Sequence, residues 1–177
     1  KLAMENEDFD TSSRAYRQAV NQGQYSRFKN PETNLGFAQA LINKGGDAGL
    51  DARSRVELNQ TLVDVAKDNN DDQGIQVRSR LIKATSLQRS DPEAAAKLTE
   101  EAMGRLQEMD QFLSPEAALS VASQLKNLGQ ADASVGVLKS CAEIYGDDPV
   151  VMQNIAKHTD DPAILGANTV AVDINQQ

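Results

Sequence analysis

The chain has 177 residues, of which 40% are apolar and 4% aromatic, and 26 acidic against 18 basic residues give a formal net charge of −8. Proteins that bind a phosphate backbone normally carry a basic patch or stripe, so this balance argues against a nucleic-acid partner. No apolar run approaches the roughly 18 residues that span a bilayer, which argues against a membrane protein. The richness in Ala, Leu and Gln, without strand-like alternation, predicts an all-α fold.

The starts of the helices can be read from capping residues. All five prolines follow Asn, Asp or Ser, a pattern typical of a helix that begins at the proline. We expect Ser12 or Ser13 to cap an earlier helix, Asp51 another, and Asp71 or Asp72 the next. The predicted helices span 12–22, 31–44, 52–68, 73–89, 92–111, 115–128, 131–145, 149–158 and 162 onward. Because the loops are short, the helices are predicted to form antiparallel hairpins stacked as an α-solenoid.

One helical sequence unit occurs twice in the chain, as PETNLGFAQALINKG at 31–45 and PEAALSVASQLKNLG at 115–129. Both copies begin with Pro-Glu, carry Leu-x-x-Ala-x-x-Leu on one helix face and end at a glycine, Gly45 or Gly129, that can adopt the left-handed conformation. A weaker third copy lies within IQVRSRLIKATSLQRS. The residues predicted to be buried are Leu35, Ala38, Leu41, Leu81, Ala84, Leu87, Leu119, Ala122, Leu125 and Leu138.

The segment 115–148 resembles the tetratricopeptide repeat (TPR), a 34-residue helical hairpin. With the first proline as position one, small residues stand at positions 8, 20 and 27 and large ones at positions 11 and 24, as in that repeat. These residues are Ala122, Ser134, Cys141, Leu125 and Leu138. A new helix is predicted to begin 34 residues after the first proline. The segment departs from the pattern at the fourth position, where Ala118 replaces an aromatic residue, and Ser134 and Cys141 replace the usual alanines.

The resemblance implies a single helical-repeat region over residues 1–177. Its expected parts are a leading helix at 12–22, hairpins at about 31–70, 73–111 and 115–146, and incomplete helices over 149–177. We expect it to be a fragment of a longer protein. The stretch FDTSSRAYRQAVNQGQYSRFKNPETNLGFAQAL also resembles the start of the repeat region in bacterial response regulators that join a receiver domain to TPRs. That resemblance implies a cytoplasmic adaptor in signal transduction.

Motifs for catalysis, metal binding or cofactor binding are not found. The single histidine, His158, has Ile155 where a di-metal bundle needs Glu, so a surface imidazole is expected. The stretch DNNDDQG at 68–74 fails the calcium-loop pattern because its glycine is one place late and Ser79 replaces the closing Glu, so it predicts a capped turn. The single cysteine, Cys141, is interpreted as a packed thiol rather than a nucleophile. We therefore expect no enzyme activity, no metal and no cofactor.

The first helix of each predicted hairpin would line a concave, partner-binding face. The polar positions on that face are Gln39, Asn43, Arg78, Thr85, Arg89, Ser123, Lys126 and Asn127. Asn43 and Asn127 could bind a peptide backbone, although a hydrogen bond to a carbonyl at their own helix end is the favoured interpretation, and both stay open. Arg78, Arg89 and Lys126 favour a partner that is locally acidic or ends in a carboxylate, unless they balance neighbouring acids.

The predicted function is a non-catalytic protein–protein interaction scaffold that presents a groove to a protein or peptide partner. The alternative is a structural spacer or dimerisation module, which would form a homodimer without a groove ligand.

Overall fold

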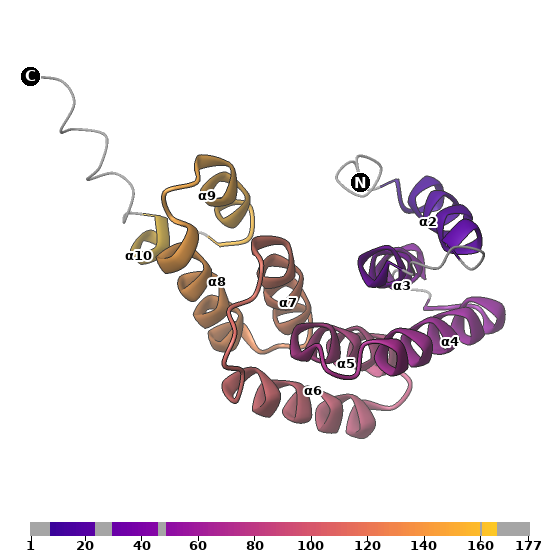
Figure 1. Cartoon of the computed structure of the whole chain (residues 1–177). Coiled ribbons are helices and arrows are strands. Elements are labelled where there is room, and N and C mark those ends of the chain that lie inside the picture. Colours follow the sequence, from indigo (N-terminus) through magenta and orange to yellow (C-terminus); the bar gives the residue numbers. More distant parts are fainter. Residues whose placement is uncertain (1–7, 24–29, 46–48, 160, 166–177) are drawn as a thin grey trace, which may run out of the picture. The chain divides into compact units, whose positions relative to one another are not determined.

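The computed structural model describes residues 8–23, 30–45, 49–159 and 161–165, and Figure 1 shows the chain as a ribbon. Within these residues every regular element is an α-helix and no strand occurs, which confirms the predicted all-α class. The helices are α2 (Phe9–Gly23), α3 (Pro31–Gly45), α4 (Ala52–Asp68), α5 (Gln73–Leu87), α6 (Pro92–Gln107), α7 (Pro115–Asn127), α8 (Ala131–Tyr145), α9 (Pro149–Ala156) and α10 (Pro162–Leu165). No helix among the described residues is long and apolar enough to cross a membrane.

Most helices begin where the sequence predicts, because a side chain before the first turn accepts a backbone N–H that has no partner inside the helix. Asp51, Asp72, Asp91, Ser114 and Asp148 each accept a hydrogen bond from the N–H three residues later. Within the stretch at 68–74, residues 69–71 form a turn after α4, and Asp72 is the cap of α5.

Several predicted helix ends differ from the structure. α5, α6, α7 and α9 end at 87, 107, 127 and 156, before the predicted 89, 111, 128 and 158. α2 begins at Phe9 and is capped by Asp8, whose Oδ1 accepts the Thr11 N–H at 3.0 Å. Ser12 and Ser13 are buried inside the helix instead of capping it. Gly129 lies just after α7 with φ of 78°, but Gly45 is still helical. The α3 backbone therefore continues one residue further than the sequence suggests.

The described residues divide into two compact units, 1–107 and 108–177. In the first unit α3 packs against α2, α4 and α5, while α5 also packs against α4 and α6. Its apolar core consists of Leu35, Phe37, Ala38, Leu41, Leu58, Leu62, Val65, Ile75 and Ile82. Tyr16 and Val20 of α2 pack against this core as partly buried side chains.

In the second unit α7 packs against α8 and α9, and α8 also packs against α9 and α10. The core residues are Ala118, Ala122, Leu138, Cys141, Val151, Met152, Ile155 and Ile164. The Ser134 hydroxyl on α8 donates a hydrogen bond of 2.7 Å to the Ala122 carbonyl of α7. The serine side chain is short, so it can reach the backbone of the next helix only if the two helices lie close together. The small side chain of Ala122 permits this.

Eight of the ten residues predicted to be buried are buried in the structure. Leu87 and Leu119 are only partly buried. Leu87 is the last residue of α5, where the helix end leaves one side open, and Leu119 lies at the edge of the second core. The leucine triplets therefore locate the packing face correctly and overestimate its extent.

Candidate functional site

The first unit has a cleft of about 500 Å³ between α2, α3 and α4. Its apolar part is formed by Val20 of α2, Phe37 of α3 and Val56 of α4. Phe37 belongs to the core, whereas Val56 is 69% exposed, so the apolar surface runs from the core to the solvent edge of the cleft. A concave site with an apolar floor and a few polar groups is the usual form of a ligand site.

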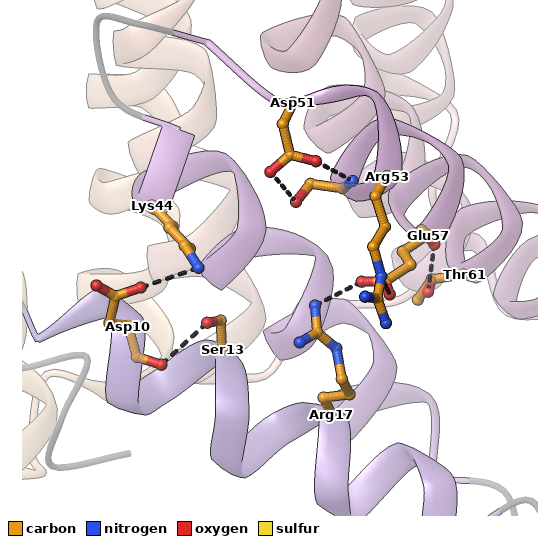
Figure 2. Close-up of polar contacts among 9 residues, drawn as sticks. Asp10, Ser13, Arg17, Lys44, Asp51, Arg53, Glu57 and Thr61 are labelled. Carbon is orange, nitrogen blue, oxygen red and sulfur yellow. Dashed lines mark hydrogen bonds and ion pairs between the residues drawn. The ribbon is translucent and has the colours of Figure 1, made fainter.

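Two arginines share one carboxylate among the residues that line the cleft, and Figure 2 shows Arg17 and Arg53 beside Glu57. Glu57 accepts a contact of 2.6 Å from Arg17 Nη2 and one of 3.2 Å from Arg53 Nε. The Arg17 guanidinium also lies 5.7 Å from the centroid of the Phe37 ring, within the range of a cation–π contact. Arg17 is thus held by α3 and α4 although it belongs to α2.

The face of α4 that lines the cleft follows from helical periodicity. Arg53, Glu57, Gln60, Thr61 and Asp64 stand at i, i+4, i+7, i+8 and i+11, which places them on one side of the helix. The Gln60 amide donates a hydrogen bond of 2.9 Å to Asp64 Oδ1, and the Thr61 hydroxyl donates one of 2.8 Å to the Glu57 carbonyl. The α4 wall therefore combines these polar residues with Val56, and it carries the charge of Arg53 near its start and of Asp64 toward its end.

The opposite wall comes from the start of α3 and supplies amide and hydroxyl groups. Asn30, Thr33 and Asn34 line the cleft there. Asn30 Oδ1 accepts the Glu32 N–H at 2.9 Å as the helix cap. Amide side chains carry both a donor and an acceptor, which is the combination that pairs with a peptide backbone.

The third wall is α2, which packs against α3 with the Tyr16 ring over Gly36. A Cβ added at Gly36 would stand 2.6 Å from the Tyr16 ring, so only glycine allows this approach without movement of the ring. Lys44 Nζ pairs with Asp10 Oδ1 at 2.9 Å, and both side chains are labelled in Figure 2. Close packing at Gly36 together with ion pairs at the surface fixes the position of α2, and hence of Arg17, at the cleft.

The predicted groove residues of the first unit lie on α3, on α5 and just after α5. The Gln39 amide donates a hydrogen bond of 2.8 Å to Asn43 Oδ1, and both side chains are partly buried. The Thr85 hydroxyl donates to the Leu81 carbonyl at 3.0 Å. Arg89 is exposed beyond the end of α5. Gln39, Thr85 and Arg89 each take part in interactions in the structure.

Arg78 is placed differently from an exposed groove residue. Its side chain is 9% exposed, and Nη1 lies 2.5 Å from Oε1 of Glu32 at the start of α3. This guanidinium therefore bridges α5 and α3 within the first unit.

The remaining groove residues belong to α7 in the second unit. Ser123 is partly buried, while Lys126 and Asn127 are exposed near the end of the helix. Lys126 is the basic residue in the last turn of α7, a position where a cation is favourable next to the helix dipole.

The residues weighed for chemistry have structural surroundings. Burial raises the pKa of the Cys141 thiol above its ordinary value, with a further contribution from the Glu116 charge, which lowers the fraction of reactive thiolate. His158 Nδ1 lies 2.9 Å from the Asn154 carbonyl in its own helix turn, and the imidazole is partly buried rather than fully at the surface. No group of three or more potential metal ligands occurs among the residues that the structure describes.

The cleft between α2, α3 and α4 was missed by the sequence analysis. The spacing of Arg53, Glu57 and Asp64 on α4 was a usable local signal. The pairing of Arg17 with Glu57 joins residues 40 positions apart, and nothing in the local sequence indicates it.

Comparisons with family models, with curated proteins and with solved structures gave no significant match.

Proposed function

We propose that the chain is a non-catalytic protein–protein interaction scaffold, and that the cleft between α2, α3 and α4 holds a peptide segment of its partner. The observation that carries the proposal is the composition of the cleft. It combines the apolar surface of Phe37 with amides that can pair with a peptide backbone, such as Asn34 and Gln60. Its charged groups Arg17 and Glu57 are engaged with each other, which suits recognition better than proton transfer.

We propose a TPR-like arrangement of stacked antiparallel hairpins as the architecture of this scaffold. The packing of α7 on α8 supports it, because Ser134 contacts the backbone of Ala122 where the repeat requires small residues on facing helices. The cap of α9 by Asp148 also supports it, because α9 begins 34 residues after α7 does. A cytoplasmic role in signal transduction, as in response regulators that carry such repeats, completes the proposal.

A dimerisation module is the second candidate function. Phe112 is 76% exposed and Val150 is 63% exposed, both in the second unit, and exposed apolar side chains favour self-association. Sedimentation velocity of the wild type and of a Phe112→Ser variant separates this candidate from the scaffold. A dimer that dissociates in the variant would favour the module.

The scaffold proposal is tested with a peptide array, followed by calorimetric titration of the best-binding peptide. The double substitution Asn34→Ala and Gln60→Ala should weaken binding. It removes, from opposite walls of the cleft, two side-chain amides that would hydrogen-bond to the backbone of the bound peptide. The matched control is Asn59→Ala, which removes an exposed amide from α4 outside the cleft. Equal affinity of the wild type and the double variant, with the circular dichroism unchanged, would refute this site.

A further inference from the structure

We propose that the cleft between α2, α3 and α4 carries opposite charges at the two ends of its α4 wall. We propose further that its ligand is an extended peptide with an acidic and a basic group about five residues apart. This inference rests on the proposed peptide-binding function of the cleft and specifies what that peptide must carry. It differs from the basic strip predicted from the sequence, of which Arg78 is buried against Glu32.

The end of the cleft next to the start of α4 carries an excess positive charge. Arg17 and Arg53 share the single carboxylate of Glu57, so two cations face one anion. Arg53 contacts Glu57 through Nε, and its side chain is 81% exposed, which leaves most of its guanidinium accessible. Asp51, which caps α4 and does not line the cleft, offsets the positive end of the helix dipole, so the excess positive charge is that of the two arginines in the lining. A carboxylate of a ligand would be attracted to this end.

The other end of the cleft carries a negative charge. Asp64 is exposed there, and the hydrogen bond that it accepts comes from the neutral amide of Gln60. That contact orients the carboxylate without neutralising it. A lysine or arginine of a ligand would be attracted to this end.

The separation of the two ends sets the spacing of the ligand charges. Arg53 and Asp64 are 11 residues apart on α4, which corresponds to about 16 Å at 1.5 Å per residue. An extended peptide advances about 3.3–3.6 Å per residue, so this distance spans about five residues. Between the ends lie Asn34 and Gln60, whose amides would pair with the peptide backbone, and the apolar surface of Phe37 and Val56.

Three acetylated hexapeptides with the same apolar centre test the charge pattern on the full chain. The first has glutamate at its first position and lysine at its sixth, the second has glutamine at both, and the third has the two charges only two positions apart. Binding is followed through the backbone amide signals of α2, α3 and α4 in NMR titrations. We expect the first peptide to bind about tenfold more tightly than the second, from about threefold for each exposed ion pair. The third should lose about threefold because it can reach only one end.

Variants of the chain assign the effect to the two ends. Arg53→Gln and Asp64→Asn should each reduce the preference for the charged peptide over the neutral one about threefold. The matched controls are Arg55→Gln, on the same helix but outside the cleft, and Glu100→Gln on α6, both of which remove an exposed charge. Neither should change the preference.

The outcomes separate this inference from the function on which it rests. If the neutral peptide binds the cleft as tightly as the charged one, the charge pattern is wrong and the scaffold proposal stands. If the charge preference persists in both Arg53→Gln and Asp64→Asn, the charges act elsewhere and the inference is overturned. If no peptide at millimolar concentration shifts the amides of α2 to α4, the cleft does not bind peptides and both proposals fail.

Discussion

Replacing Ala122 with leucine tests the close contact between α7 and α8. Ala122 is 1% exposed, and its carbonyl accepts the Ser134 hydroxyl at 2.7 Å, so the two helices meet at this residue. Leucine adds three carbon atoms where no space exists for them. Overpacking of this kind costs about 1–3 kcal/mol, and about 1 kcal/mol more is lost if the helices separate far enough to break the hydrogen bond.

The assay is urea unfolding followed by circular dichroism, together with thermal unfolding. For a unit of this size each kcal/mol lowers the melting temperature by about 4–8 °C. The matched control is Ala156→Leu, the same substitution at an exposed position of α9 in the same unit, which should be nearly neutral because Ala and Leu have similar helix propensities. If Ala122→Leu is as well tolerated as Ala156→Leu, the two helices do not meet at this position, and the repeat register assigned to α7 and α8 is wrong.

Three further predictions follow from local contacts. Gly36→Ala should accelerate amide exchange in α2, because the new Cβ would stand 2.6 Å from the Tyr16 ring. In a Tyr16→Ala background the same substitution should stabilise the folded chain by up to about 1 kcal/mol, because alanine has the higher helix propensity. Equal effects in both backgrounds would contradict the close contact between Gly36 and Tyr16. Hydrogen bonds from Ser54 lower the pKa of Asp51, so its stabilising effect is present above the unfolded value of 3.8 and is lost as the pH falls through the lower folded value. Asp51→Ala should therefore lower the melting temperature at pH 7, and the difference in melting temperature from the wild type should shrink below pH 3.8. A difference that does not depend on pH would show that the ionised form of Asp51 is not what stabilises the start of α4. Cys141, buried and with a raised pKa, should react slowly with an aromatic disulfide reagent until the chain is unfolded in guanidinium, and rapid reaction of the folded chain would place the thiol at the surface.

The helices could be predicted from the sequence because their signals are local. A cap such as Asp72 or Ser114 acts within three residues of itself. The failure at α2 has the same origin: Asp8, Ser12 and Ser13 are all good capping residues, and a local rule cannot choose among them. The choice depends on burial against the rest of the first unit, which is a tertiary property.

The candidate site could not be predicted, because its contacts join distant parts of the chain. Arg17 reaches Glu57 across 40 residues, and Arg78 reaches Glu32 across 46. Periodicity shows which residues share a helix face, but it does not show which charged residues of that face become covered by another helix. For this reason the sequence placed Arg78 on an open surface and gave no weight to Arg17.

The ion pair of Arg78 and Glu32 leads to a prediction about which partner matters more for stability. Arg78 is 9% exposed at its side chain, and its Nε is buried without a hydrogen-bond partner, whereas Glu32 is 56% exposed. Glu32→Ala leaves a buried cation without its counter-charge, while Arg78→Met leaves only a solvated carboxylate.

Glu32→Ala should therefore destabilise the first unit by about 1–3 kcal/mol, and by more than Arg78→Met does, with the lower end of the range set by the solvent exposure of Glu32. In urea unfolding the double variant should be more stable than Glu32→Ala alone, since removing Arg78 also removes the stranded charge. If Arg78→Met is the more damaging single change, the guanidinium contributes through packing or through other contacts, and the burial argument that separates Arg78 from the accessible Arg53 fails.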